Sequence, residues 1–150
     1  MHGLTLYEIA QILKKKQFSL PTPEVEAFKM IYCISKKMEV AGCHQLTLPY
    51  ESPCTRLHGH NWTITVFLAS EELNENGMVE DFKHVKNKIH GYLDHQNINE
   101  LLPFNPTSEN VAKWIVEQFP MCYKAIVEES YGNAAQVYDD DFPIDAKYLL

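Results

Sequence analysis

Four reactive or charged side chains stand close together between positions 54 and 60. Within seven positions the chain places Cys54, Arg56, His58 and His60, and Arg56 is its only arginine. Imidazole and thiolate groups are common zinc ligands and general bases. The run TITVFLAS, which has the β-branched content of a strand, follows almost at once. The stretch therefore predicts chemistry at the beginning of a strand.

The pair His58 and His60 has the spacing of a metal site built on a strand. Residues i and i+2 of a strand point to the same face, with side chains roughly 7 Å apart along the chain. Two such imidazoles can converge on one ion, with His44 on the preceding predicted strand as the candidate third ligand. Three histidines leave one position of a tetrahedral zinc open, which is typical of a catalytic site. The alternative is a chance pair in a chain with seven histidines.

Cys54 lies four residues before His58 and has several possible roles. A nearby zinc ion or a protonated histidine favours the thiolate form of a cysteine. Cys54 is therefore a candidate base, nucleophile or fourth ligand. It can also be a small buried apolar residue.

Three acidic residues add candidates for proton transfer and binding. Asp94 precedes His95 after a predicted helix, and a carboxylate beside an imidazole fixes its tautomer and raises its basicity. The alternative is a helix end with ordinary polar residues. Glu128 and Glu129 end a predicted strand, and alternation turns one of them inward, where a carboxylate needs paired donors.

The elements that must position these residues follow from hydrophobic periodicity. Strands are expected at 30–46, 57–70 and 124–130, and helices at 78–93 and 104–119. Thr107 or Ser108 is a plausible N-cap of the second helix. This order of elements predicts an α+β fold, with an antiparallel sheet covered on one face by helices. The long strands leave sheet edges that oligomer formation can cover.

Residues 1–28 form a predicted extension in front of one domain over 29–150. Within it, residues 5–16 resemble a short amphipathic helix whose apolar positions are Leu6, Ile9, Ile12 and Leu13. The run SLPTPE, with two prolines, then ends that helix.

Length and charge exclude several classes of protein. A chain of 150 residues fits one domain with a real core. The net charge of −7 argues against nucleic acid as the main partner. No run of 18 apolar residues predicts a membrane span, and the beginning of the chain does not have the pattern of a secretory signal. The four cysteines lack the spacing of a disulfide scaffold, so we expect free thiols and a cytoplasmic location.

Six segments in register resemble the 6-pyruvoyl-tetrahydropterin synthase and 6-carboxytetrahydropterin synthase family. They are VAGCHQL, CTRLHGHNW, GMVEDF, LDHQNIN, NPTSENVAKWI and VEESYGNAAQVY. The resemblance covers roughly residues 30–138 and implies the tunnelling fold, a four-stranded antiparallel sheet with two helices on one face. It also implies that three subunits join their sheets into a barrel, that two trimers form a hexamer, and that active sites lie between subunits.

The resemblance assigns roles to individual residues. It implies Zn²⁺ held by His44, His58 and His60. It implies proton transfer by Cys54, Asp94 and His95, the last two supplied by a neighbouring subunit. It implies that the pterin is bound by Glu129, with Glu128 as the minor alternative, and that it is touched by Thr107 and Ser108, for which capping is an equally good role.

One spacing favours the carboxy-forming branch of the family. In that branch the cysteine stands four residues before the first histidine of His-Gly-His, as Cys54 does here, whereas two more residues intervene in the animal pyruvoyl-forming branch. The implied substrate is 7,8-dihydroneopterin triphosphate. Pyruvoyl formation, an aldolase-like cleavage and a non-catalytic zinc-binding protein are the alternatives.

Three positions depart from the family pattern or stay open. Val40 and Cys43 replace the usual Phe and second Ala before His44, and Cys43 is expected on the opposite face of the strand. Arg56 either meets the triphosphate or is solvated.

Overall fold

The computed structural model describes residues 30–145 and 149–150, and within them one sheet carries the fold. Two long strands, β1 (Tyr32–His44) and β2 (His58–Ser70), pair antiparallel over their full length. On the other side of β2 the antiparallel order continues with β4 (Cys122–Ser130) and β5 (Asn133–Tyr138). A two-residue strand, β3 (Gln96–Asn97), pairs parallel to the outer edge of β1. The strand order is therefore β3-β1-β2-β4-β5.

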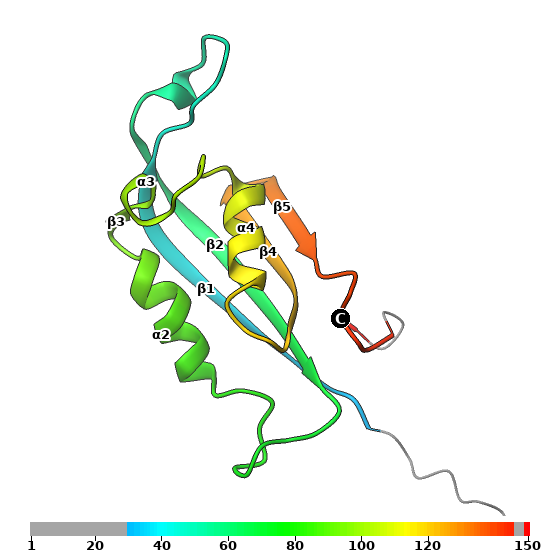
Figure 1. Ribbon diagram of the computed structural model, residues 1–150. Helices are drawn as coiled ribbons and strands as arrows, with labels where there is room; N and C mark the ends of the chain where they lie inside the picture. The colour runs from blue at the N-terminus through cyan, green and yellow to red at the C-terminus, as the bar shows by residue number, and fades with distance from the viewer. Residues whose placement is uncertain (1–29, 146–148) are drawn as a thin grey trace, which may run out of the picture.

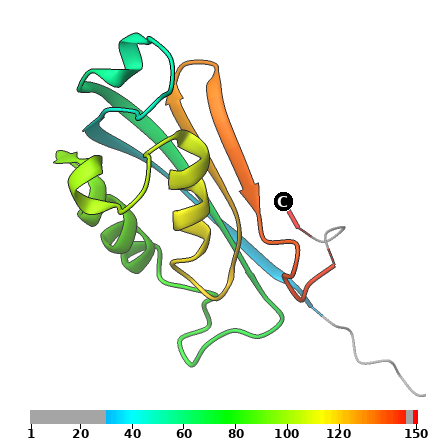
Figure 2. The same cartoon turned by 45° about the horizontal axis from the view of Figure 1, so that its top comes forward.

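Helices cover one face of this sheet (Figures 1 and 2). The helices α2 (Phe82–Leu93) and α4 (Ser108–Val116) lie side by side across it, and the short α3 (Ile98–Leu101) lies beside β3 at one edge. A single 3₁₀ turn, η1 (Pro53–Thr55), interrupts the connection from β1 to β2. The α+β class and the antiparallel arrangement of the long strands are confirmed.

The residue patterns missed some elements and misplaced some ends. The first predicted strand, 30–46, is two residues too long at each end. The second predicted helix, 104–119, begins only at Ser108, since Pro106 disfavours helical backbone before it, and it ends at Val116. β3, α3 and β5 were not found from periodicity, although the family resemblance implies a fourth antiparallel strand, which is β5. The predicted helix at 5–16 lies outside the described residues.

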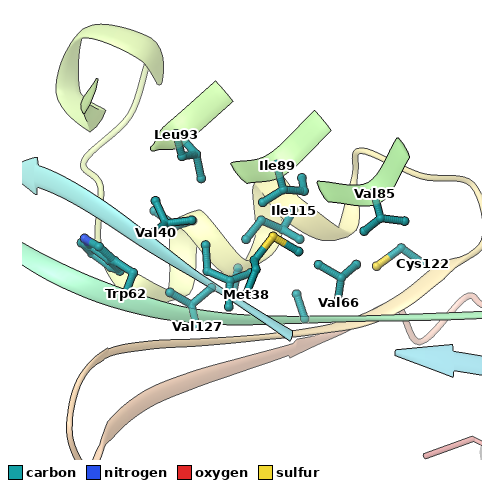
Figure 3. Packing of buried hydrophobic residues seen from close by; sticks show 14 of the residues in the cluster. Met38, Val40, Trp62, Val66, Val85, Ile89, Leu93, Ile115, Cys122 and Val127 are labelled. Carbon is teal, nitrogen blue, oxygen red and sulfur yellow. The ribbon is translucent and has the colours of Figure 1, made fainter. Parts of the chain in front are cut away.

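The main hydrophobic core lies between the sheet and the helices (Figure 3). Period 2 along β2 predicts one face for Trp62, Ile64, Val66 and Leu68, and all four side chains are almost completely buried. The helix α2 contributes its buried stripe of Val85, Ile89 and Leu93. The helical spacing of apolar residues also predicts Phe82 and Tyr92 for that stripe, but their side chains are exposed, at 48% and 43%.

A smaller cluster occupies the other face of the sheet. Phe67 and Ala69 alternate with the core residues of β2 and therefore point away from the helices. They pack with Tyr123 and with Phe142 and Ile144, from the segment that follows β5. No helix in the described part of the chain is long and apolar enough to cross a membrane.

Candidate metal centre and active site

The pairing register of β1 and β2 brings the three histidines together. His44 lies directly opposite His58, and His60 follows two residues later on the same face as the buried Trp62. The ring centroids of the three imidazoles lie 4.6–5.3 Å apart. One ligand nitrogen from each histidine lies within 4.8 Å of the others. The three imidazoles therefore form one cluster, at the end of the sheet face that packs against the helices.

Two backbone carbonyls fix the orientation of the rings. Nδ1 of His44 lies 2.8 Å from the carbonyl oxygen of Pro106, and Nδ1 of His58 lies 2.7 Å from that of Arg56. A carbonyl only accepts, so each Nδ1 donates its proton and each Nε2 keeps a free lone pair. Burial lowers the pKa of His44, which favours the neutral form that can bind a metal. This arrangement is typical of metal-binding histidines.

Two Nε2 atoms of this cluster are buried without a hydrogen bond. Within the described residues, Nε2 of His44 and Nε2 of His60 are inaccessible to solvent and make no hydrogen bond. A buried polar atom left unpaired costs roughly 1–3 kcal/mol. A cation shared by the three imidazoles would satisfy both atoms, so the residues present fit a bound metal ion. A set of three nitrogen ligands suits zinc and several other transition metals.

Glu129 is the carboxylate that reaches this cluster. Its Oε1 lies 3.2 Å from Nε2 of His44 and 3.9 Å from Nε2 of His60. Glu129 shares strand parity with the buried Val127, whereas Glu128 accepts a hydrogen bond from the backbone N–H of Gly132 at 3.0 Å. Of the two glutamates, the inward one is therefore Glu129, and Glu128 stabilises the turn between β4 and β5.

A pocket of about 550 Å³ opens beside Glu129. Its lining includes four of the predicted site residues, Cys54, Thr107, Ser108 and Glu129. The turn η1 places Cys54 there, because Ser52 caps the turn and the carbonyl of Cys54 accepts from the backbone N–H of Leu46 at 2.7 Å. The structure therefore joins the thiol and the inward carboxylate in one concave site next to the imidazoles.

Thr107 also has a clear structural role. It is the N-cap of α4, and its side-chain oxygen accepts from the backbone N–H of Asn110 at 3.3 Å. The predicted capping by Thr107 is thus confirmed. Ser108 is the first residue of the helix.

Asp94 and His95 form a second reactive pair at the end of α2. Oδ2 of Asp94 lies 2.8 Å from Nδ1 of His95, and Oδ1 accepts from the backbone N–H of Ala41 at 2.9 Å. The Ala41 N–H, followed by the His95 imidazole, lowers the pKa of the Asp94 carboxyl. The carboxylate therefore holds the His95 proton on Nδ1 and leaves Nε2 able to accept another.

His95 is presented to solvent by an unusual backbone. Its side chain is 80% exposed, and its φ of 58° is the only positive value for a non-glycine residue in the part of the chain described. Such a conformation is costly, and it is found disproportionately at functional sites. His95 lines a different pocket from Cys54, of about 460 Å³, together with residues of β1, β2 and β3. A single chain does not bring the two groups into one pocket.

Three further residues can now be placed. Cys43 points away from the imidazole cluster, and its Sγ lies 3.8 Å from the carbonyl of Gln96, as its parity predicted. Arg56 is exposed, and its contact with the site is through its carbonyl. The carbonyl of Pro106 was missed, because a backbone acceptor leaves no signal in the sequence.

Comparisons with known proteins point to one family. The family model described as 6-pyruvoyl tetrahydropterin synthase matches residues 33–138. The chain is 37% identical over 122 residues to the 6-carboxy-5,6,7,8-tetrahydropterin synthase of Synechocystis, covering 72% of this chain and 94% of that protein. It is 29% identical over 114 residues to the Bacillus subtilis protein of the same name, covering 65% of this chain and 78% of that one.

A solved structure shares the fold. The 6-pyruvoyl tetrahydropterin synthase of Caenorhabditis elegans is 26% identical, with a TM-score of 0.62, and the match covers 76% of this chain and all of that one.

Proposed function

The chain belongs to the 6-pyruvoyl tetrahydropterin synthase family, and on this premise we propose that it is a zinc-dependent 6-carboxy-5,6,7,8-tetrahydropterin synthase. The reaction converts 7,8-dihydroneopterin triphosphate and water to 6-carboxytetrahydropterin, acetaldehyde and triphosphate. The observation that carries the proposal is the pair of buried Nε2 atoms of His44 and His60, which make no hydrogen bond and lie beside the pocket that contains Cys54. We place this step in cytoplasmic 7-deazaguanine and queuosine biosynthesis.

The metal would be held by His44, His58 and His60, with Glu129 beside it. When bound, zinc supplies a Lewis acid that acidifies hydroxyl groups of the substrate and stabilises negative charge on oxygen. The backbone carbonyls of Pro106 and Arg56 keep the His44 and His58 rings in the tautomer that binds it.

The carboxylate of Glu129 suits the pterin ring. A carboxylate accepts two parallel hydrogen bonds, and the ring N–H and 2-amino group of a pterin present two adjacent donors. Glu129 is partly buried, at 24% exposure of its side chain, so such a pair of bonds would form in a setting with little competing water. Thr107 and Ser108 line the same pocket and would contact the ring from the beginning of α4.

Cys54 and the Asp94–His95 pair would move the protons. The conversion shifts reducing equivalents between the side chain and the ring, which requires protons to leave one carbon and reach another but needs no redox cofactor. Asp94 keeps the His95 proton on Nδ1, so Nε2 can accept a substrate proton. Because Cys54 and His95 line different pockets of one chain, we propose that the active site is shared between subunits of a homohexamer.

The spacing of Cys54 and His58 favours the carboxy-forming branch, and the names of the two bacterial relatives agree with it. The likeness to the nematode protein favours 6-pyruvoyltetrahydropterin formation as the second candidate. Incubating the zinc-loaded protein with 7,8-dihydroneopterin triphosphate, followed by mass spectrometry, separates the two. Acetaldehyde with a 6-carboxy product supports the proposal. A pyruvoyl product, or an aldolase-type cleavage product, contradicts it, and no turnover in any condition favours a non-catalytic zinc protein.

A further inference from the structure

An apolar groove lies at the end of the sheet that is farthest from the histidines. It has a volume of about 450 Å³ and is formed by the beginning of β1 and the loop from β2 to α2. The register places this end opposite the site, since Tyr32 pairs with Ser70 at one end and His44 pairs with His58 at the other. In Figure 1 this loop lies below α2, and the β1 to β2 connection lies at the top.

The groove is lined by large apolar side chains that the described residues leave uncovered. Tyr32, Leu73 and Met78 are 38–39% exposed, and Phe82 is 48% exposed. Phe82 is also a residue whose helical spacing predicted burial. A gathering of exposed apolar side chains on a folded domain typically marks an interaction site.

The loop that forms one side of this groove is acidic. The loop between β2 and α2 carries five carboxylates and neither lysine nor arginine: Glu71, Glu72, Glu75, Glu80 and Asp81. Glu72 and Glu75 are exposed. An apolar groove beside an acidic loop selects a partner with an apolar stripe and adjacent positive charges.

We propose that residues 5–16 of the same chain occupy this groove as an amphipathic helix. Leu6, Ile9, Ile12 and Leu13 fall on one side of a helix and would face the apolar floor. Three consecutive lysines, at 14–16, end the segment and would meet the exposed carboxylates of the loop, such as Glu72 and Glu75. This inference does not depend on the proposed function.

The chain is long enough for this arrangement. Residues 17–29 connect the segment to the beginning of the described structure, and thirteen extended residues span up to roughly 45 Å. The groove adjoins Ile31, so only part of that reach is needed. Attachment within one chain gives the segment a high effective concentration, and a second chain is not required.

Hydrogen exchange on the full-length protein tests the proposal. In the double variant I9D/L13D, two charges would enter the apolar floor, so the segment should leave the groove. Amides of residues 71–81 should then exchange about tenfold faster than in the wild type, because their loop loses its cover. The matched control is Gln11→Asp, which places one charge on the opposite side of the same helix and should change nothing. Equal exchange in wild type and the double variant overturns the proposal.

A crosslink identifies which chain supplies the segment. With Ile9→Cys and Met78→Cys in one chain, oxidation should give an intrachain disulfide, seen as a faster-migrating monomer band in a non-reducing gel, and an unshifted monomer band overturns the proposal. The pair Gln11→Cys with Met78→Cys is the control and should crosslink much less. A covalent dimer instead shows that a second copy supplies the segment and overturns the proposal. All these variants should keep wild-type metal binding and turnover, so a failure here is distinguishable from a failure of the proposed function.

Discussion

Main-chain carbonyls, which no substitution of side chains can remove, orient two of the three imidazoles. His44 and His58 each donate an Nδ1 proton to such a carbonyl, and the ring of His44 is in edge contact with Trp62, 4.7 Å between centroids. The nitrogens that face the common centre are therefore fixed before any ion binds. Preorganisation of this kind predicts that metal affinity depends on each ring individually.

The first prediction concerns metal affinity. His44→Ala should weaken zinc binding at least about 100-fold, since it removes one of three protein ligands. Competition with a chromogenic chelator measures this change. His84→Ala, which removes an exposed imidazole of α2, is the matched control and should bind zinc like the wild type. Equal affinity in both variants would contradict the assignment of His44.

The second prediction separates catalysis from metal binding at Cys54. Cys54 lines the pocket, and the group of residues that can hold a metal contains only histidines among those described. Cys54→Ala should therefore keep zinc affinity within about threefold but lower kcat by about 10²–10⁴-fold, the usual contribution of a general acid or base. Cys43→Ala, on the opposite face of its strand, should preserve kcat. Zinc loss in Cys54→Ala would identify Cys54 as a ligand.

The third prediction concerns a thiol that should be inert. Burial raises the pKa of Cys122 to about 11, so this thiol stays protonated at pH 8, and only the thiolate is a strong nucleophile. An alkylating reagent at pH 8 should modify the partly exposed Cys54 well before Cys122 in the folded protein. Peptide mass spectrometry at timed intervals measures both rates.

The same thiol should make stability depend on pH. In the unfolded chain Cys122 ionises near its ordinary pKa of 9.0, so its contribution to stability should fall as the pH rises from 9 towards 11. Cys122→Ala should lose that part of the pH dependence.

At the scale of elements, the beginning of α4 serves both the fold and the site. Thr107 caps the helix, and the carbonyl of Pro106, immediately before it, accepts from His44. The beginning of the helix therefore also supports one ring of the imidazole cluster. Loss of the Thr107 cap should therefore lower the stability of the fold, whether or not Thr107 contacts the pterin.

The fourth prediction separates capping from binding. Thr107→Ala should lower the free energy of unfolding by about 1 kcal/mol, the usual cost of losing an N-cap, as measured by denaturant titration. Ser108→Ala, one residue later in the first turn, should cost little stability because it caps nothing. If both residues also contact the pterin, each variant should raise KM. A stability loss in Ser108→Ala as large as that in Thr107→Ala would contradict the assignment of the cap.

The sequence predicted which residues share a face of a strand better than it predicted which residues of neighbouring strands pair. Period 2 along β2 was enough to find the face that carries Trp62, His58 and His60. It could not show that His44 lies opposite His58, because register depends on the whole β1–β2 ladder. It also left Glu128 and Glu129 unresolved, since β4 shifts register against both neighbouring strands. The family resemblance, with its fixed motif positions, supplied the ligand set and the choice of Glu129.

The shortest elements could not be predicted from the sequence either. β3 has two residues and α3 has four, which is too few for any periodicity to stand out. Their position is set by tertiary contacts: the backbone N–H of His95 donates to the carbonyl of Ala41, and Gln96 then pairs with Gly42. These contacts place the Asp94–His95 pair at the edge of the sheet rather than near Cys54.

At the scale of the whole molecule, one chain leaves its reactive groups divided. Cys54 and Glu129 line one pocket, and His95 lines another. In the part of the chain described, the outer edge of β5 also has no strand beside it. An open strand edge offers unpaired backbone groups to a second chain. The proposed hexamer would pair these edges and bring His95 of one subunit to Cys54 of the next.

The fifth prediction tests this sharing with two inactive variants. Cys54→Ala and His95→Ala should each be nearly inactive as pure oligomers. When they are unfolded together in equal amounts and refolded, a shared site that takes its cysteine from one subunit and its histidine from the next is intact in about a quarter of cases under random assembly. The mixture should therefore recover about a quarter of wild-type activity, whereas separately refolded proteins mixed afterwards, the control, should recover very little. If each chain held a complete site, no mixing would restore activity, because every site would carry one of the two substitutions. Sedimentation of the wild type at about six times 17.3 kDa would establish that the exchanging species is the proposed hexamer.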